Sequence, residues 1–218
     1  MFTGLIETTG KILSADQRAG TMRVAVEAPG IAERLKTGDS VAVSGVCLTA
    51  LDIEPGLFHA DLAAETAART SLAQLAPGTT VNLELPTPAG APLGGHVVQG
   101  HVDATGTLVS IKQVDPNADH TIADWWLEVE IPEALRPFMV EKGSVAIEGI
   151  SLTIARWDGK TVSVAILPHT YAATNLHTLK AGSAVNLEAD VLVKLAAERR
   201  PAASTFELTV DYLVANGY

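Results

Sequence analysis

The sequence predicts an all-β protein of two small closed barrels followed by a C-terminal helical tail. Three observations support this: a long internal repeat, an apolar period of two within each half, and a change of pattern after residue 190. Residues 40–84 align without a gap with residues 144–188, and 16 of these 45 positions are identical. Upstream, FTGLIETTG aligns with VQGHVDATG at a different offset, so Gly4 pairs with Gly100. Such self-similarity indicates two homologous units.

Strands are indicated in both halves by alternating apolar residues. The clearest segments are 23–26, 40–44 and 81–85 in the first half, and 127–131 and 162–166 in the second. A period of two favours strands with one buried and one wetter face. Closing each sheet into a barrel would remove edges that a half of about 90 residues could hardly cover.

Helical patterns are short and lie at 31–35, 65–75 and 133–139. The stretch 85–93 holds three prolines and one glycine, which is typical of a domain boundary. We therefore expect barrels at 1–90 and 94–189 and a helical tail at 190–218. In the tail, Asp190 is placed to cap a helix over 191–199, and a second helix is expected over 205–215. The apolar stripe of this tail suits oligomerisation or packing on its own domain.

Composition limits the classes of partner. The chain carries a formal net charge of −10 and has no cluster of lysine or arginine, which argues against nucleic acid and against an anionic membrane. Its one cysteine, Cys47, can form no intrachain disulfide. No apolar stretch is long enough for a membrane span, and a cytoplasmic protein is expected.

The candidate chemical residues are polar groups that the repeat brings into register. Cys47 and Thr49 in the first half correspond to Ser151 and Thr153 in the second. Small groups two apart lie on one side of a strand and suit a flat heterocycle, although strand propensity and burial alone would also explain them. His96 and His101 lie five apart, which on an extended strand sends them to opposite faces, so no shared metal is expected. The segments ending in Thr66 and Thr170 could hold polyol hydroxyls, or these threonines could simply cap helices.

The motifs MFTGLIE, SGVCLT, GGHVVQGHVD, EKGSVAIEGISLT and LPHT together resemble the riboflavin synthase family over essentially the whole chain. The resemblance implies two six-stranded Greek-key barrels of the flavin-reductase-like kind. It also implies a homotrimer built through the C-terminal helix, with lumazine synthase as a further expected partner. The activity implied is dismutation of two molecules of 6,7-dimethyl-8-ribityllumazine into riboflavin and 5-amino-6-ribitylaminouracil. No metal or redox cofactor is implied.

By the same resemblance, His101, Ser151, Thr153 and Cys47 are the expected catalytic residues. The first three would assist proton transfer, and Cys47 would line the partner pocket together with Thr49. The remaining expected substrate contacts are Phe2, Thr3, Gly4, Leu5, Ile6, Ser40, Leu48, Thr49, Asp61, Leu62, Ala63, Ala64, Glu65, Thr66, Gly100, Val102, Lys142, Leu152, Leu167, Pro168, His169, Thr170 and Asp190.

The chain departs from the family where Leu85, in place of the usual arginine, follows Glu84. Such a change in the first half leaves open a specialised relative. The alternative function is a non-catalytic lumazine- or flavin-binding antenna or carrier protein. The retention of Cys47, His101, Ser151 and Thr153 favours the enzyme.

Overall fold

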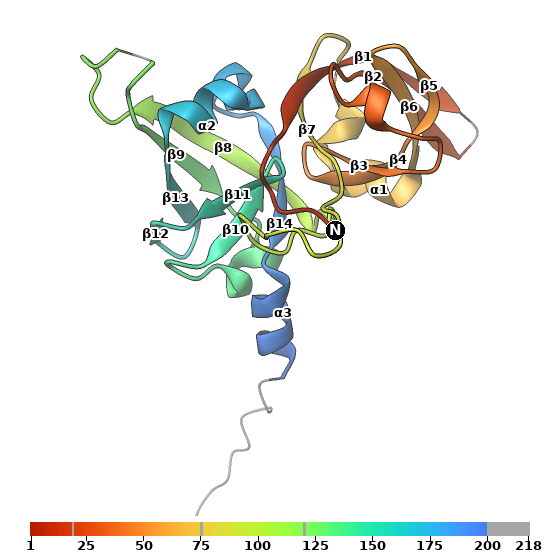
Figure 1. The fold of residues 1–218 in the computed structure, drawn as a ribbon. Helices are drawn as coiled ribbons and strands as arrows, with labels where there is room; N and C mark the ends of the chain where they lie inside the picture. The colour runs from red at the N-terminus through yellow and green to blue at the C-terminus, as the bar shows by residue number, and fades with distance from the viewer. Residues whose placement is uncertain (19, 75, 120, 200–218) are drawn as a thin grey trace, which may run out of the picture.

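A computed structural model describes residues 1–199 apart from 19, 75 and 120, and consists of two antiparallel sheets that each curl around an apolar core (Figure 1). The first sheet has the order β4-β3-β7-β1-β2-β6-β5, and the second repeats it as β11-β10-β14-β8-β9-β13-β12. In each sheet the third strand along the chain pairs with the last strand and not with the second. This is the connectivity expected of a Greek key. The duplicated β-barrel fold is therefore confirmed, with seven strands in each sheet where the resemblance implied six.

The strands of the first sheet are β1 (Thr8–Arg18), β2 (Thr21–Glu27), β3 (Ser40–Val43), β4 (Val46–Thr49), β5 (Leu51–Glu54), β6 (Leu57–Ala63) and β7 (Thr80–Glu84). Those of the second are β8 (Ala104–Gln113), β9 (Trp125–Glu130), β10 (Ser144–Ile147), β11 (Ile150–Thr153), β12 (Arg156–Trp157), β13 (Thr161–Ile166) and β14 (Ala184–Ala189). The short helices are η1 (Ala32–Arg34), α1 (Ala64–Arg69), η2 (Ser71–Gln74), η3 (Glu133–Phe138), α2 (Pro168–Ala173), η4 (Asn175–Thr178) and α3 (Val191–Glu198).

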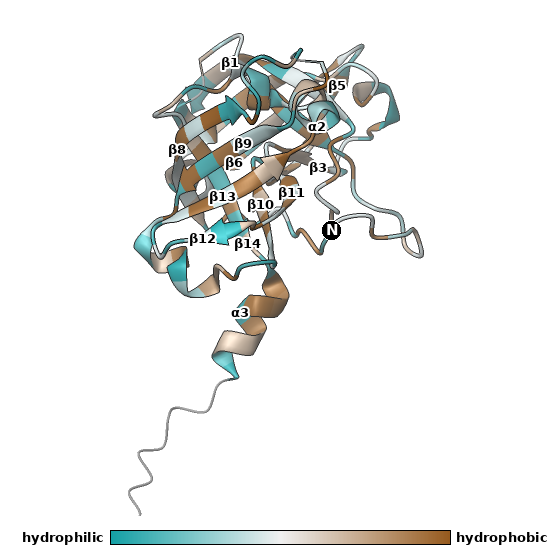
Figure 2. Cartoon of the chain, turned by 90° about the vertical axis from the view of Figure 1, so that its left-hand side faces the viewer, coloured by the Kyte–Doolittle hydropathy of each residue, from teal (hydrophilic) through white to brown (hydrophobic). Residues whose placement is uncertain are grey.

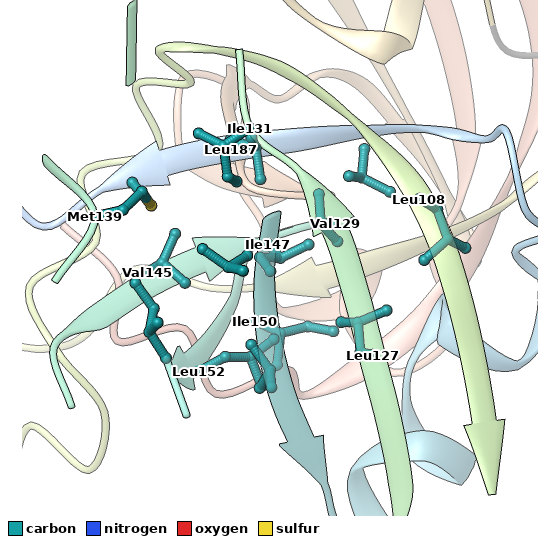
Figure 3. Close-up of a cluster of buried hydrophobic side chains, with 14 of the residues drawn as sticks. Leu108, Leu127, Val129, Ile131, Met139, Val145, Ile147, Ile150, Leu152 and Leu187 are labelled. Atoms are coloured by element: carbon teal, nitrogen blue, oxygen red, sulfur yellow. The ribbon is translucent and has the colours of Figure 1, made fainter. Parts of the chain in front are cut away.

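Each barrel has its own core of inward-facing branched side chains. Leu127, Val129 and Ile147 are at most 1% exposed in the second core (Figure 3), and Val24, Val26 and Phe58 fill the first in the same way. Period-two alternation therefore identified the inward faces correctly, because side chains of a strand alternate between the two sides of a sheet.

The expectation of a wetter outer face is wrong for β7, and its repeat equivalent β14 is buried in the same way. Asn82 and Glu84 on β7, like their repeat equivalents Asn186 and Glu188 on β14, are at most 4% exposed. The asparagines face the other barrel, and each glutamate binds a backbone segment that passes over it. The polar side of these strands is therefore covered by protein instead of water.

The two barrels meet across a buried polar interface with approximate twofold symmetry. The Asn82 side-chain amide donates to the Glu148 carbonyl oxygen at 2.9 Å, and the Asn186 amide donates to the Ser44 carbonyl oxygen at 2.9 Å. The Asn82 amide also donates to the Asn175 side-chain oxygen at 2.9 Å, and within the second barrel the Asn175 amide donates to the Glu148 carboxylate at 2.8 Å. Because a buried polar group left unpaired is costly, this network fixes one docking geometry.

Burial raises the pKa of the Glu148 carboxyl, against the lowering effect of its hydrogen bonds to Asn186, Asn175 and Ser44. The folded state therefore holds a proton at pH values where the unfolded chain has lost it. We expect the stability of the wild type relative to Glu148→Gln to fall as the pH rises above the ordinary value of 4.5. Urea unfolding at a series of pH values measures this, with the exposed Glu54→Gln as control. A stability difference that grows with pH would contradict it.

The C-terminal helix begins where the sequence predicts. The Asp190 carboxylate accepts a 2.9 Å hydrogen bond from the Leu192 N–H, as a capping residue does. Helix α3 extends from the body of the molecule (Figure 2), with Leu192 64% and Leu195 46% exposed. The helix expected over 205–215 lies outside the described residues. Among the residues described, no helix is both long and apolar enough to cross a membrane.

Candidate functional site

The backbone segments ahead of β1 and β8 cross from their own barrel to the other one. The Gly4 carbonyl oxygen accepts a 2.8 Å hydrogen bond from the Ser151 N–H on β11, and the Gly100 carbonyl oxygen accepts one of 2.9 Å from the Cys47 N–H on β4. The two segments also meet each other, because Phe2 and Val98 form a β-bridge. Each barrel thus places its leading segment beside the strand of the other that bears the thiol or the hydroxyl.

Glycine is required at both positions where the segments cross, 4 and 100. Gly4 has φ +76° and Gly100 has φ +79°, a region that side chains disfavour. A Cβ at Gly4 would lie 2.6 Å from the Ser151 backbone nitrogen, and one at Gly100 would lie 2.6 Å from the Cys47 Cβ. The glycine pair found in the repeat therefore allows the two backbones to approach closely.

Two buried glutamates hold the crossing segments. Glu84 accepts hydrogen bonds from the Thr3 N–H at 2.7 Å, the Thr3 hydroxyl at 2.8 Å and the Gly4 N–H at 3.0 Å. Glu188 accepts from the N–H groups of Gln99, Gly100 and His101 at 2.7, 2.9 and 3.0 Å. Burial raises the pKa of both carboxyls, and these hydrogen bonds oppose the rise.

Neither Glu84 nor Glu188 is among the functional residues that the sequence predicts. Both residues end the run VNLE, which occurs in each half of the chain, so the repeat could have identified them. A charged side chain in an alternating strand was interpreted as solvent-exposed, and its backbone partners could not be recognised from residue type.

The crossing creates two composite pockets. The first pocket is lined by Val46, Cys47, Glu65, Thr66, Arg69, Thr70, Gly100, His101 and Val102. The second pocket is lined by Gly4, Leu5, Ile6, Ile150, Ser151, His169, Thr170, Ala173 and Thr174. Each combines a strand and a helix of one half with the leading segment of the other, so neither pocket is complete within a single repeat.

Twelve of the expected site residues are brought together in these pockets. Cys47, Glu65, Thr66, Gly100, His101 and Val102 share the first, and Gly4, Leu5, Ile6, Ser151, His169 and Thr170 share the second. Within one chain, His101 therefore lies with Cys47 and not with Ser151 and Thr153.

Thr49 and Thr153 are exposed on the same strand sides as Cys47 and Ser151, since the alternate residues of β4 and β11 are buried. Phe2 is fully buried in a small cluster with Ala42, Val98 and Ala146. Thr3 contacts Glu84, and Ser40 borders a separate cavity with Glu84 and Pro86.

The other expected contacts line neither pocket. Leu48, Leu62 and Leu152 are core residues, and Asp61 pairs with Arg23. Ala63 and Leu167 are the N-caps of α1 and α2, beside Ala64 and Pro168, while Asp190 caps α3 and Lys142 has a positive φ of 66°.

Two local expectations are corrected. Thr66 and Thr170 lie inside α1 and α2 and do not cap them, because the N-caps are Ala63 and Leu167. The segment 96–101 is not an extended strand beyond the bridge at Val98. His96 and His101 still point to different places, the former to Ser151 and the latter to the first pocket.

The functional groups that line the two pockets are weak acids and bases. The first pocket offers a thiol, a threonine hydroxyl and an exposed imidazole, and the second offers the hydroxyls of Ser151 and Thr170 with the His169 imidazole. These groups can bind the polar edge of a ring and shuttle protons. A reaction that relies on positioning two reactants requires little more.

Comparison with known proteins agrees with the duplicated architecture. A family model described as the lumazine binding domain matches residues 3–86 and again residues 99–190. Riboflavin synthase of Actinobacillus pleuropneumoniae is 37% identical over 222 residues, covering 100% of both chains. Riboflavin synthase of Bacillus subtilis is 37% identical over 194 residues, covering 89% of this chain and 87% of its own.

Solved structures show the same fold. LumP complexed with riboflavin superposes with a TM-score of 0.78 at 25% identity, covering 87% of this chain and 99% of LumP. LumP complexed with 6,7-dimethyl-8-(1'-D-ribityl) lumazine gives a TM-score of 0.76 at 24% identity with the same coverage.

Proposed function

The chain belongs to the riboflavin synthase family of lumazine-binding transferases, and we propose that its two composite pockets each bind one 6,7-dimethyl-8-ribityllumazine. The reaction transfers four carbons from one lumazine to the other, which yields riboflavin and 5-amino-6-ribitylaminouracil. The observation that supports this use of the pockets is their pairing: one ancestral site is present twice, with thiol and imidazole in one copy and hydroxyls in the other.

Positioning and mild proton transfer supply the catalysis. The C7 methyl of the lumazine is acidic because its carbanion delocalises into the electron-poor ring, so a hydroxyl or imidazole suffices to move its proton. Holding two large rings face to face supplies much of the remaining acceleration. Because the same compound is both donor and acceptor, the overall reaction needs no outside oxidant, and no cofactor is proposed.

We also propose that the active site forms between copies of the chain, with the first pocket of one facing the second pocket of its neighbour. A homotrimer built through α3 accounts for the exposed Leu192 and Leu195 on that helix. Lumazine synthase remains a proposed partner, because it would supply the substrate. The unpaired Cys47 supports a cytoplasmic location, which is likewise a proposal.

Mixed assemblies test the arrangement between copies. We expect His101→Ala in the first pocket and Ser151→Ala in the second each to lower riboflavin formation by at least about tenfold. Trimers formed from both variants in equal amounts should regain roughly a quarter of wild-type activity, because one site in four joins two intact pockets.

A mixture of His101→Ala with Cys47→Ala is the matched control, since both changes lie in the first pocket and no intact site can form. Recovery in that control, or no recovery in the first mixture, would contradict active sites between copies.

A further inference from the structure

Lys194 ties helix α3 to the second barrel. Its ammonium group donates to both carboxylate oxygens of Asp103 at 3.0 Å, and the two side chains are only 23% and 24% exposed. In the described part of the chain, no other side chain of α3 makes a hydrogen bond to the barrel. Asp103 also accepts the Ala189 N–H at 2.9 Å, so the ion pair joins the helix to the end of β14.

The first half contains the same arrangement, but its cation comes from another element. Glu7 is the repeat equivalent of Asp103, accepts the N–H of the residue after VNLE at 3.1 Å, and pairs with Arg34 at 2.5 Å. Arg34 ends η1 of its own barrel, whereas Phe138 ends η3 at the corresponding position of the second barrel. The second barrel therefore takes its cation from the C-terminal helix, which has no counterpart in the repeat.

The ion pair lies beside the carboxylate that anchors the leading segment of the first pocket. Burial raises the pKa of the Glu188 carboxyl, and the backbone N–H groups that it accepts lower this pKa. The positive charge of Lys194 also lowers it, whereas the negative charge of Asp103 raises it. Lys194 thus offsets the repulsion between two carboxylates that are both held by backbone donors.

We infer that Lys194 is a positioning residue for the first pocket. Its ion pair with Asp103 and its charge near Glu188 steady the backbone of residues 99–101, which carries His101 into that pocket. The C-terminal helix then supports the site as well as any contact between copies. The inference rests on the proposed function, in which His101 acts on a lumazine in the first pocket.

Amide hydrogen exchange of the full-length protein measures this anchoring without turnover. Lys194→Met keeps an unbranched side chain of similar length and removes the charge. Because a partly buried carboxylate loses its partner, we expect exchange at residues 99–101 to become about tenfold faster. Residues 3 and 4 are the internal reference, since Glu84 holds them in the other half. Unchanged exchange at 99–101 would overturn the inference.

Steady-state kinetics and a conservative variant supply the second readout. We expect Lys194→Met to lower kcat by about tenfold, because a misplaced reacting group costs rate. Lys194→Arg keeps a cation and should restore both kcat and exchange to within about threefold of the wild type. Arg199→Met removes an exposed charge just beyond α3 and is the matched control, with wild-type values expected. Equal losses in Lys194→Met and Arg199→Met would overturn the inference.

Leu192→Gln separates anchoring from contact between copies, because it alters the exposed apolar face of α3 and keeps Lys194. Whatever oligomeric state light scattering shows, exchange at residues 99–101 should stay at least about threefold slower than in Lys194→Met. Exchange as fast as in Lys194→Met would overturn the inference. A wild type that forms no riboflavin, with exchange as expected in every variant, would instead contradict the proposed function.

Discussion

Replacing Glu188 by alanine is expected to cost about 3 kcal/mol of stability and about 100-fold in riboflavin formation. The carboxylate accepts three backbone N–H groups from residues 99–101, and hydrogen bonds to charged groups are among the stronger ones. Without it, those donors are left unpaired and the segment that positions His101 in the first pocket is released. Urea unfolding and steady-state kinetics measure the two effects.

Glu188→Gln tests whether both carboxylate oxygens are needed as acceptors. Both carboxylate oxygens are acceptors, so the amide NH₂ of Glu188→Gln would face at least one N–H donor and recover only part of the loss. Glu128→Ala is the control, because among the described residues that carboxylate accepts a single hydrogen bond, from the Ser110 hydroxyl, and its loss should cost less than about 1 kcal/mol. A Glu188→Ala variant as stable and active as the control would refute the anchoring role.

Alanine at Gly149 should be the most damaging small substitution at the barrel interface. Gly149 has φ +77°, and its Cβ would lie 2.6 Å from the backbone nitrogen and 2.8 Å from the Cα of Gly45. Backbone cannot move aside as a flexible side chain can, so we expect a loss of about 3 kcal/mol or more from strain and separation of the barrels together.

Gly159→Ala separates the two contributions. Gly159 has φ +93° and no heavy atom within 4 Å of the added Cβ, so only the backbone conformation is penalised, by about 1 kcal/mol. Thermal unfolding of both variants provides the comparison. Equal losses at the two positions would mean that close contact between Gly45 and Gly149 contributes nothing to docking.

The parts of the fold that could be predicted depend on interactions between residues close together in the sequence. Alternation located β2 and β13, and the side chain of Asp190 marked the start of α3, because strand faces and caps depend on residues near in sequence. The repeat register also paired Cys47 with Ser151 correctly as equivalent positions on β4 and β11.

The crossing of the leading segments could not be predicted in this way. The bonds of Gly4 to Ser151 and of Gly100 to Cys47 join backbone atoms, and backbone atoms are the same at every residue. For the same reason the sequence could not show that His101 and Ser151 line different pockets within one chain. Glu84 and Glu188 were missed because their partners are N–H groups.

Conversion of the substrate distinguishes an enzyme from a protein that only binds lumazine. Purified protein is incubated with 6,7-dimethyl-8-ribityllumazine under anaerobic conditions, and riboflavin is followed by its absorbance. We expect one riboflavin for every two lumazines consumed, with 5-amino-6-ribitylaminouracil as the other product. Tight binding of the lumazine without any riboflavin formed would contradict it and indicate a binding protein built on the same paired pockets.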